Sequence, residues 1–322
     1  MKKRSIIKLP VWSGLLLNLC ICFSFASPVD EWEAFGDTAF EDGFALSPLN
    51  TKIVEEKGGW EKACVDTLYV EKQDKKPIWK IAQWNSKHDL GNTLPVRNQD
   101  GSITYTNQGK KVVWHQDGSL WLEINTSQEY DKPRKENEPW PHLLIEQNFK
   151  RQPNIGKVKQ LNFSMEIKLE KCERKMSDSE YNPELHTAQT PFYFVLRNVN
   201  SKAPDFNSFI WLGIPSYDYR YQQMSDKETI SWDIETATYI YNVPQLPVWG
   251  DINFNDKQWH QAKVDVLPLI KEAIEKMKSK GFFKDTAWED MEICGMNFGW
   301  EVPGTFDTAV SVRNMSLKVT DK

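Results

Sequence analysis

LNFSMEIKLE, at residues 161–170, is the stretch that decides the fold class of this 322-residue chain. Its five apolar residues alternate with five polar residues without a break, so the apolar side chains point to one side and the polar side chains to the other. A period of two is typical of a β-strand that has one buried and one solvated face. The stretch therefore predicts a strand at the surface of a β-sheet protein.

A hairpin and further strands are predicted outward from this stretch. Residues 111–115 and 120–124 flank Gln116-Asp117-Gly118-Ser119, and Asp-Gly supplies the positive φ angles that a tight turn needs. Further strand candidates are residues 143–149, 192–199, 208–214, 238–243, 259–266, 291–298 and 308–319. Many short strands separated by turns predict an all-β fold, an antiparallel β-sandwich.

One segment departs from the β pattern. Apolar residues recur at helical spacing from Leu267 to Met277, Pro268 suits the first turn of a helix, and Gly281 stands where such a helix would end. We expect one amphipathic helix at about residues 268–280, the only long helix of the chain. Its apolar stripe is expected to pack on the sandwich.

The final strand carries a change of parity. Val310 and Val312 occupy one parity, whereas the apolar residues from Met315 to Val319 occupy the other. A β-bulge adds one residue to a strand and re-aims the side chains that follow it. The switch therefore predicts a bulge at Arg313-Asn314.

The chain begins with the ordered features of a secretory signal peptide. Residues 2–4 are basic, residues 9–25 are largely apolar, and Ser24 and Ala26 offer small residues at the two positions that a signal peptidase reads. We expect an exported protein, periplasmic or extracellular, that is not inserted in a membrane once this segment is removed. The expected organisation is a signal peptide at residues 1–26, an N-terminal extension packed on the body at residues 27–59 and a single β-sandwich domain at residues 60–322.

Charge and cysteine content exclude several classes of partner. Removal of residues 1–26 takes away four basic residues and no acidic ones, so 40 basic against 45 acidic residues becomes 36 against 45, a net charge of −9. An acidic chain without basic runs is a poor partner for nucleic acid or anionic membranes. Only Cys64, Cys172 and Cys294 then remain, so at most one disulfide can form, and their spacings of more than 100 residues exclude a local zinc site.

Tryptophan and polar residues share several segments. Thirteen of the 14 tryptophans follow residue 26, and rings stand beside polar groups in Trp140-Pro141-His142, in Trp211 to Arg220 and in Trp300-Glu301. An aromatic ring covers the apolar C–H face of a pyranose, while carboxylates, amides and guanidinium groups satisfy its hydroxyls. The segments predict a carbohydrate partner.

Strand parity selects the side chains of this surface. The apolar residues of the strand at 120–124 leave Trp121 and Glu123 on the opposite face, and His142 shares a face with Glu146. We hypothesise one concave surface that combines paired carboxyl groups with stacking rings. The catalytic candidates are Glu123, Glu146 and His142, and the substrate-binding candidates are Trp121, Trp140, Arg197, Trp211 and Tyr219.

Three segments resemble parts of a known superfamily. Glu166-Ile167-Lys168-Leu169-Glu170 looks like the Glu-x-Asp-x-Glu strand of laminarinase-like retaining glycosidases, which belong to the concanavalin-A-like jelly-roll superfamily. Trp259-His260 at the start of a strand, and Phe298-Gly299-Trp300-Glu301 before the final strand, also look similar to segments of that superfamily. The resemblance implies a jelly-roll fold and a glycan-active protein.

The resemblance also implies roles for individual residues. It gives Glu166 the role of nucleophile and Glu170 that of the acid, although Lys168 stands where the pattern has Asp and the acid motif is therefore degenerate. It implies no cofactor for catalysis, but a structural calcium at the edge of the sandwich. The expected calcium ligands are Asp307 with Glu31, Glu33 or Asp42.

Three functions remain open. A glycoside hydrolase acting on a poly- or oligosaccharide is preferred, because small binding modules seldom need nearly 300 residues. The missing acid motif favours the alternative, a noncatalytic carbohydrate-binding protein. A polysaccharide lyase stands third; it would need a base such as His142 or Tyr219 and a neutralising group such as Arg197, Arg220 or Gln147.

Overall fold

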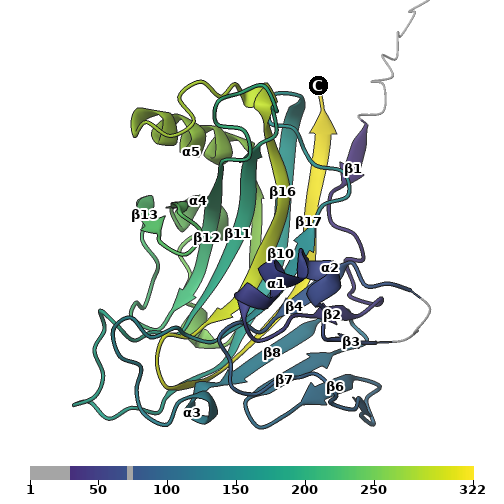
Figure 1. Cartoon of the computed structure of the whole chain (residues 1–322), viewed down its shortest axis with the longest axis vertical. Coiled ribbons are helices and arrows are strands. Elements are labelled where there is room, and N and C mark those ends of the chain that lie inside the picture. Colours follow the sequence, from purple (N-terminus) through teal and green to yellow (C-terminus); the bar gives the residue numbers. More distant parts are fainter. Residues whose placement is uncertain (1–29, 71–74) are drawn as a thin grey trace, which may run out of the picture.

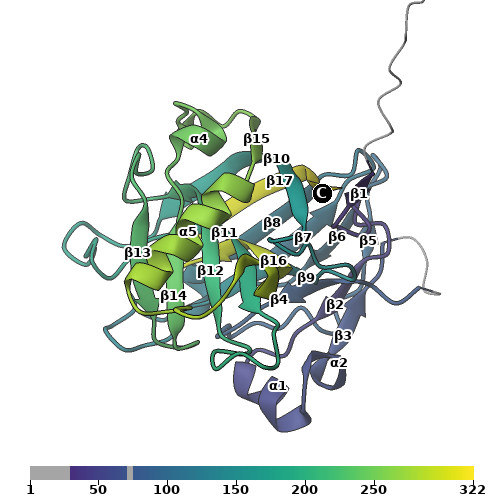
Figure 2. The same ribbon diagram turned by 90° about the horizontal axis from the view of Figure 1, so that it is seen from above.

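The computed structural model describes residues 30–70 and 75–322 (Figure 1). The predicted signal peptide at residues 1–26 lies outside the described residues. Two β-sheets pack face to face, which confirms the predicted β-sandwich (Figure 2). Among the described residues, no helix has the length and apolar character needed to cross a membrane.

Sheet A has eight strands in the order β15-β10-β17-β8-β7-β6-β5, with β1 paired to β17. All its pairs are antiparallel. Its strands are β1 (Glu31–Glu33), β5 (Val96–Arg97), β6 (Ile103–Thr106), β7 (Lys110–Trp114), β8 (Leu120–Asn125), β10 (Val158–Arg174), β15 (His260–Asp265) and β17 (Phe306–Asp321).

Sheet B has nine strands in the order β13-β14-β12-β11-β16-β9-β4-β2-β3. Two of its pairs, β12 with β14 and β2 with β4, are parallel, and the others are antiparallel. Its strands are β2 (Phe44–Leu46), β3 (Asp66–Leu68), β4 (Trp79–Ala82), β9 (His142–Asn148), β11 (Gln189–Asn198), β12 (Phe209–Asp218), β13 (Thr229–Asp233), β14 (Thr238–Asn242) and β16 (Met291–Glu301).

The core lies between the two sheets. Phe163 of β10 packs against Phe192 of β11, with ring centroids 4.8 Å apart, and Trp300 of β16 donates from its indole N–H to the carbonyl of Leu122 on β8 at 3.1 Å. Since successive side chains of a strand alternate, the neighbours of these core residues point away from the core. The face of sheet B that points away from sheet A is called the outer face of sheet B below.

The local predictions for the strands and the turn are confirmed. Residues 161–170 lie in β10, with the apolar set buried and the polar set partly exposed. The hairpin joins β7 and β8, and Gly118 in its turn has φ +77°. The register between β10 and β17 shifts between Ser164 and Glu166, opposite Asn314, which has φ +55° and forms the predicted bulge.

The predicted helix is α5 (Leu267–Ser279), whose buried side chains join the core. The remaining helices are short: α1 (Thr51–Lys57), α2 (Trp60–Ala63), α3 (Thr126–Glu129), α4 (Leu246–Trp249) and the 3-10 turns η1 (Phe254–Asp256) and η2 (Trp288–Asp290). The prediction of a single long helix is therefore confirmed for the described residues.

The segment before residue 60 takes part in both sheets. β1 pairs with β17 in sheet A, and β2 pairs with β4 in sheet B. Phe40 is fully buried and packs on Trp79 of β4, with ring centroids 5.0 Å apart. The segment thus carries part of the core and leads into α2, which brings Trp60 to the outer face of sheet B.

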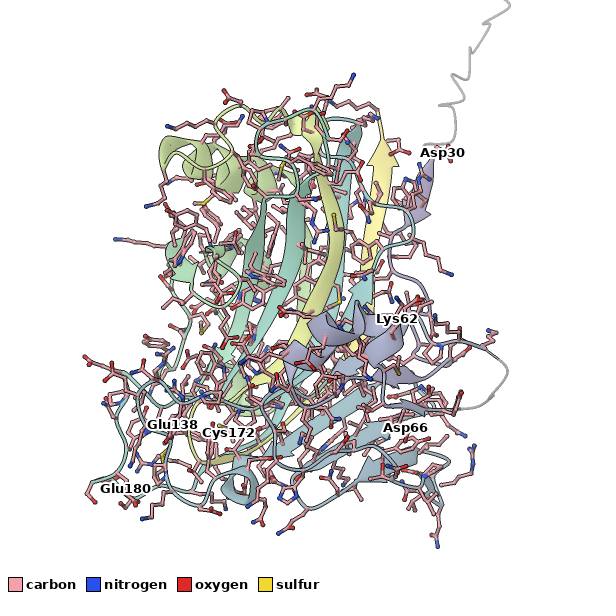
Figure 3. The ribbon with its side chains drawn as sticks, viewed as in Figure 1. Asp30, Lys62, Asp66, Glu138, Cys172 and Glu180 are labelled. Carbon is pink, nitrogen blue, oxygen red and sulfur yellow. The ribbon has the colours of Figure 1, made fainter. Side chains whose placement is uncertain are left out.

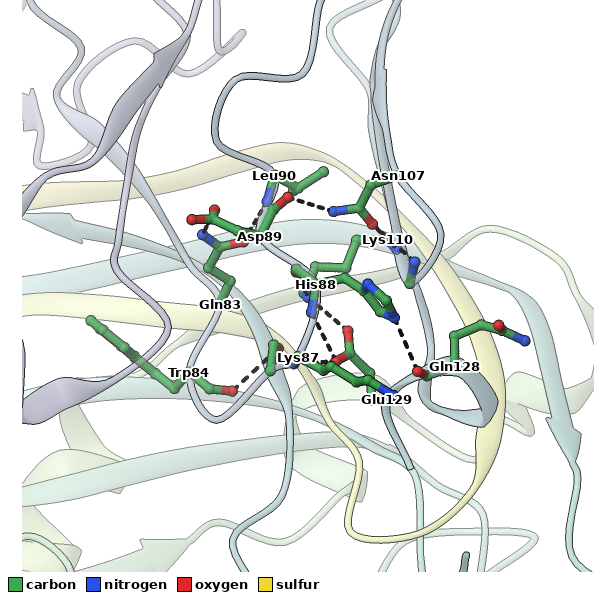
Figure 4. A network of polar contacts seen from close by, with 12 residues as sticks. Gln83, Trp84, Lys87, His88, Asp89, Leu90, Asn107, Lys110, Gln128 and Glu129 are labelled. Atoms are coloured by element: carbon green, nitrogen blue, oxygen red, sulfur yellow. Dashed lines mark hydrogen bonds and ion pairs between the residues drawn. The ribbon is translucent and has the colours of Figure 1, made fainter. Parts of the chain in front are cut away.

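A buried ion pair fixes the loop that follows β4 (Figure 4). Lys110 donates from Nζ to Glu129 Oε1 at 2.8 Å, and both side chains are inaccessible to solvent, with exposed fractions of 0% and 1%. Lys110 Nζ also donates to the carbonyl of His88, and Glu129 Oε2 accepts from the backbone N–H groups of Lys87 and His88. The pair therefore ties α3 and β7 to residues 83–90, the loop that presents Trp84.

Candidate functional site

A row of polar side chains crosses the outer face of sheet B. Glu146 on β9 is the cross-strand partner of Lys80 on β4 and of Asn297 on β16, and Asn297 is in turn opposite Tyr193 on β11. All four are partly exposed. The register thus places a carboxyl group between an ammonium group and an amide.

A second row lies four residues further along the same strands. Glu301 on β16 is opposite His142 on β9 and Gln189 on β11, and Gln189 Nε2 donates to Glu301 Oε2 at 2.8 Å. Four residues of strand correspond to roughly 13 Å between Cα atoms. The level between the rows is occupied by Leu144 and by Gly299, which has no side chain. This level between the two glutamates is called the gap: β16 carries no side chain there, and β9 carries the buried Leu144.

Gly299 is required at this level. Its φ of +148° is a conformation that L side chains rarely adopt, and a Cβ atom there would lie 2.2 Å from the carbonyl oxygen of Leu143. The glycine lets β9 and β16 approach closely and leaves the β16 side of this level without a side chain.

The carboxyl group of Glu301 is prepared as an acid. Burial raises the pKa of Glu301 to about 7, against a smaller opposing effect of the hydrogen bond from Gln189. The charge of Asp233, at the end of β13, raises the pKa further. Glu301 therefore holds a proton at mildly acidic and near-neutral pH.

Glu146 lies in a different environment. Burial also raises the pKa of Glu146, but the charge of Lys80 and hydrogen bonds from the side chains of Trp84 and Trp60 act in the opposite direction. Glu146 differs from Glu301 in having a cation beside it, since the charge of Lys80 favours the ionised form of Glu146. The two carboxyl groups on this face are thus suited to different protonation states.

His142 is a neutral imidazole at physiological pH. Burial lowers the pKa of His142 to about 4, which the charges of Glu235 and Asp233 only partly offset. Its ring lies 5.8 Å from the ring of Trp140. His142 can therefore donate or accept a hydrogen bond, but it is not a charged acid at pH 7.

Buried polar atoms without partners gather on this face. Within residues 30–70 and 75–322, five buried side-chain nitrogen or oxygen atoms have no hydrogen-bond partner, and four of them belong to residues on or beside the outer face of sheet B. They are Trp140 Nε1, His142 Nδ1, Asn297 Oδ1 and Arg197 Nε. Native proteins leave few such atoms unpaired, because each one costs about 1–3 kcal/mol. Their clustering indicates a surface built to meet hydroxyl groups of a ligand.

Aromatic rings stand at two sides of the gap. Trp60 packs on Trp84 with centroids 5.6 Å apart, and Lys80 Nζ lies 4.9 Å from the centre of the Trp60 ring. On the other side, Trp211 lies 5.8 Å from Tyr193 and donates from Nε1 to Thr236 Oγ1 at 3.1 Å. Thr236 belongs to the turn between β13 and β14, so that hairpin borders the same face.

The structure separates Trp121 and Glu123 from the other predicted site residues. Both lie on β8 in sheet A, where Glu123 Oε1 accepts from Lys171 Nζ at 2.8 Å and Glu123 Oε2 accepts from Trp121 Nε1 at 3.1 Å. They point away from the core on the far side of the sandwich from Glu146. The prediction that Glu123 pairs with Glu146 is wrong, because parity assigns a residue to a face of its strand but not to a sheet.

Tyr219 and Arg197 also differ from the predicted arrangement. Tyr219 follows β12, is partly buried and packs edge-on against Phe306 of the core, 4.9 Å away, so it does not lie with Glu146 and His142 on the outer face of sheet B. Arg197 lies on the outer face of sheet B but toward its other end, opposite Phe209 and Glu292. His142, Glu146, Trp140 and Trp211 do share the outer face.

The acids of the degenerate motif form an ordinary surface ladder. Glu166 accepts from Arg313 Nε at 2.8 Å, and Glu170 accepts from Ser311 Oγ at 2.8 Å and pairs with Lys168 at 3.1 Å. These residues lie on β10 and β17 in sheet A, and the hydrogen bonds lower the pKa of Glu166. The hydrogen bonds on this face therefore favour the ionised form of Glu166.

The predicted calcium ligands are not together. Asp307 at the start of β17 accepts from Ser127 Oγ at 2.6 Å, whereas Glu31 and Glu33 pair with the far end of β17, opposite Thr320 and Lys318. Eleven residues of strand, roughly 36 Å, separate Asp307 from Lys318. The pairing of Asp307 with Glu31 or Glu33 is therefore wrong, and Asp42 pairs with Lys75 Nζ at 2.9 Å. Within the described residues no group of three or more His, Cys, Asp or Glu could hold a metal ion.

The three cysteines of the described part of the chain, Cys64, Cys172 and Cys294, are free thiols. Burial raises the pKa of Cys172 to about 12 and also raises the pKa of Cys294. Neither is a thiolate at neutral pH, and thiol chemistry is absent from the candidate site.

Several site residues were not predicted. Glu301 follows the strand predicted at 291–298 and so escaped the parity argument, although β16 continues through it. The sequence marks Glu301 only as the polar neighbour of Trp300, and extension of the alternation by three residues would make it a site candidate. Trp60 lies on a four-residue helix and Trp84 on a loop. In such short or irregular segments no repeating pattern in the sequence shows which way a side chain points.

Comparisons with known proteins give similarity in structure only. No family model matches the chain, and no curated protein matches it. A cellulase derived from Cel12A of Rhodothermus marinus aligns at a TM-score of 0.38 with 10% identity, over 71% of this chain and 97% of that one. A family 12 xyloglucanase from Bacillus licheniformis aligns at 0.40 with 10% identity, over 70% and 97%.

A third solved structure is of another enzyme family. The family 11 xylanase from Neocallimastix patriciarum aligns at a TM-score of 0.38 with 9% identity, over 71% of this chain and 96% of that one. These glycoside hydrolases have the concanavalin-A-like jelly-roll fold. The similarities are distant, at 9–10% identity and TM-scores of 0.38–0.40.

Proposed function

We propose that this protein is an exported, glycan-active hydrolase whose site is the outer face of sheet B between Glu146 and Glu301. The observation that carries the proposal is the cluster of unpaired buried polar atoms beside two carboxyl groups with raised pKa values. Unpaired donors and acceptors match sugar hydroxyls, and perturbed carboxyl groups are typical of functional sites. Rings at both sides supply stacking surfaces for pyranose faces.

The two carboxyl groups have different roles in this proposal. Glu301, with a pKa of about 7, protonates the glycosidic oxygen as the bond to the leaving sugar breaks. Glu146, beside Lys80, acts as the base: it takes a proton from the water whose oxygen bonds to the anomeric carbon as the leaving sugar departs. Glycoside hydrolysis by paired carboxyl groups requires such a division between a protonated and an ionised partner. An inverting enzyme also needs the two carboxyl groups about 6.5–9.5 Å apart, less than the roughly 13 Å between the Cα levels, so both side chains must lean toward each other over Gly299.

His142 and Asn297 orient the substrate in this scheme. His142 Nδ1 and Asn297 Oδ1 lie in the rows of Glu301 and Glu146 and lack partners in the protein. Hydroxyl groups of a sugar ring above Gly299 would satisfy both atoms. The imidazole is neutral at working pH and does not compete with Glu301 as the acid.

The first test is the Glu146→Gln variant. An amide preserves the shape of the side chain but cannot act as a carboxylate, so turnover is expected to fall by about 10²- to 10⁴-fold while glycan binding and the melting temperature change little. Release of reducing ends measures the turnover, and affinity electrophoresis measures the binding. Glu292→Gln, on the same face of β16 but opposite Arg197, is the control and is expected to keep its activity.

Full activity in Glu146→Gln would remove this carboxyl group from the mechanism. Unchanged glycan binding together with no hydrolysis in the wild-type protein would favour the noncatalytic carbohydrate-binding alternative. Of the neutralising groups that a lyase would need, Gln147 is already bound to the backbone of Gly36.

A stacking role is tested by Trp211→Ala. Trp211 is partly exposed on the outer face of sheet B, so its loss is expected to weaken glycan binding several-fold, with only a small loss of stability. Trp300→Ala is the matched comparison, because Trp300 is fully buried in the core and its truncation should cost about 3–5 kcal/mol of stability. Urea unfolding and affinity electrophoresis on both variants give the measurement. Equal binding by Trp211→Ala and the wild type would exclude Trp211 as a stacking surface.

A further inference from the structure

A pocket lies beside the proposed catalytic gap. It has a volume of about 400 Å³ and lies against β11, β12, β13 and β14, under the loop that joins β12 to β13. Gln189 and Tyr193 belong to its wall, and the same two residues are the cross-strand neighbours of Glu301 and Asn297. The pocket and the catalytic gap therefore share a wall.

The loop over this pocket is held in place by its own hydrogen bonds. Tyr221 donates from its backbone N–H to the carbonyl of Asp218 at 3.0 Å, and Met224 donates likewise to Gln245 Oε1 at 2.7 Å. The backbone N–H of Gln245 donates to the carbonyl of Ser225 at 3.0 Å. Anchors along its length give the pocket a fixed wall.

Positive charge is available at this wall. Arg220 donates to Asp218 through Nε and Nη2, at 3.0 Å and 2.6 Å, while its Nη1 makes no hydrogen bond to any residue in the described part of the chain. Asp218 is 3% exposed and also accepts from Thr187 Oγ1 at 2.6 Å. The acid is therefore neutralised inside the wall, whereas one end of the guanidinium group stays open to the pocket.

A second cation lies on the same loop. Lys227 lines the pocket, is exposed, and makes no ion pair with any described residue. The rings of Tyr193 and Tyr221 belong to the same lining. Two cations against one buried acid leave a net positive charge, beside rings that can stack on a sugar.

We propose that this pocket binds a carboxylate-bearing sugar residue, a hexuronate, of the glycan whose scissile bond lies between Glu146 and Glu301. A planar carboxylate matches the free end of a guanidinium group, and Lys227 adds a point charge. The inference rests on the proposed function for the placement of the rest of the glycan. The pocket itself is tested without any cleavage.

The test is a binding titration of the full-length protein by saturation-transfer NMR at low salt. The probes are methyl β-D-glucuronide, methyl β-D-glucoside and glucose 6-sulfate, and the variants are Lys227→Gln and Arg220→Lys. Lys263→Gln is the control, because Lys263 is an exposed lysine on β15 in sheet A. We expect the glucuronide to bind about five-fold more tightly than the glucoside, which corresponds to about 1 kcal/mol.

Both pocket variants are expected to reduce that preference, and Lys263→Gln is expected to leave it unchanged. Arg220→Lys keeps the charge beside Asp218, so a loss of preference reports the guanidinium geometry rather than unfolding. Equal binding of glucuronide and glucoside would overturn the proposal, and so would a preference that persists in both variants. Equal binding of glucose 6-sulfate and glucuronide would contradict the carboxylate assignment.

This experiment separates the two proposals. Glucuronide selectivity in a protein that cleaves no glycan would support the pocket and contradict the hydrolase. Cleavage of neutral glycans without glucuronide selectivity would support the hydrolase and contradict the hexuronate pocket.

Discussion

Glu301→Gln is expected to lower kcat/KM on a cleavable glycan by about 10²- to 10⁴-fold, because the amide cannot deliver a proton to the leaving oxygen. In the wild type, activity should fall above about pH 7, where Glu301 loses its proton. Activity should also fall toward acidic pH, where Glu146 becomes protonated. Initial rates from pH 4 to pH 9 measure both limbs.

The same variant is expected to be more stable than the wild type at neutral pH. The pKa of Glu301 is about 7 in the folded chain and near 4.5 in the unfolded chain. Between these values the folded state holds a proton that the unfolded state has released, so this group lowers the free energy of unfolding as the pH rises from about 4.5 to 7. Glutamine removes that loss, and a gain on the order of 2 kcal/mol above pH 7 is expected.

Urea unfolding at pH 4.5 and pH 7.5 distinguishes this effect from a general one. The gain of Glu301→Gln should be present at the higher pH and absent at the lower. Glu292→Gln, the control on the same strand, should show no such dependence. A Glu301→Gln variant with wild-type activity and no pH-dependent gain would exclude Glu301 as a protonated acid.

Glu129→Gln is expected to cost about 3–5 kcal/mol of stability, because it leaves the Lys110 ammonium buried without a counter-charge. The double variant Lys110→Met/Glu129→Gln removes the charge as well and is expected to recover most of the loss. Glu61→Gln is the control: its partner Lys76 and Glu61 are 74% and 80% exposed, and no measurable loss is expected. Urea unfolding gives the three values. A loss below about 1 kcal/mol in Glu129→Gln would show that Lys110 is not held as a buried charge.

The sequence predicts the fold where a pattern is local. The alternation in residues 161–170, the Asp117-Gly118 turn and the parity switch at Asn314 each depend on neighbours in the chain, and all three are present in the structure. The helix was found for the same reason, since its 3.6-residue period is read within one segment.

The site is harder to predict because it depends on which sheet each strand joins. Glu123 and Glu146 have the same outward parity, yet β8 lies in sheet A and β9 in sheet B, so the two carboxylates are on opposite sides of the molecule. The sheet that a strand joins is decided by its pairing with strands distant in sequence, and no local sequence pattern predicts that pairing. Trp60 reaches Glu146 for a similar reason, through the position of α2 beside β4.

Residues whose strands pair with the same neighbour can still lie far apart (Figure 3). Asp30 and Cys172, both labelled there, belong to opposite ends of the molecule, although β1 and β10 pair with the same strand, β17. β17 has 16 residues and spans the whole sandwich. Asp307 at its start and Glu31 beside its end therefore cannot share an ion. This length separates Asp307 from Glu31 and Glu33, two of its expected partners in a calcium site.

We propose that the protein hydrolyses a glycosidic bond between Glu146 and Glu301. The most direct measurement is mass spectrometry of products after incubation with neutral and uronate-containing polysaccharides in H₂¹⁸O. We predict saturated oligosaccharides that carry one ¹⁸O at each new reducing end, formed by the wild type and by Glu292→Gln but not by Glu146→Gln or Glu301→Gln. Unsaturated products without ¹⁸O, or products formed equally by all four proteins, would contradict the account.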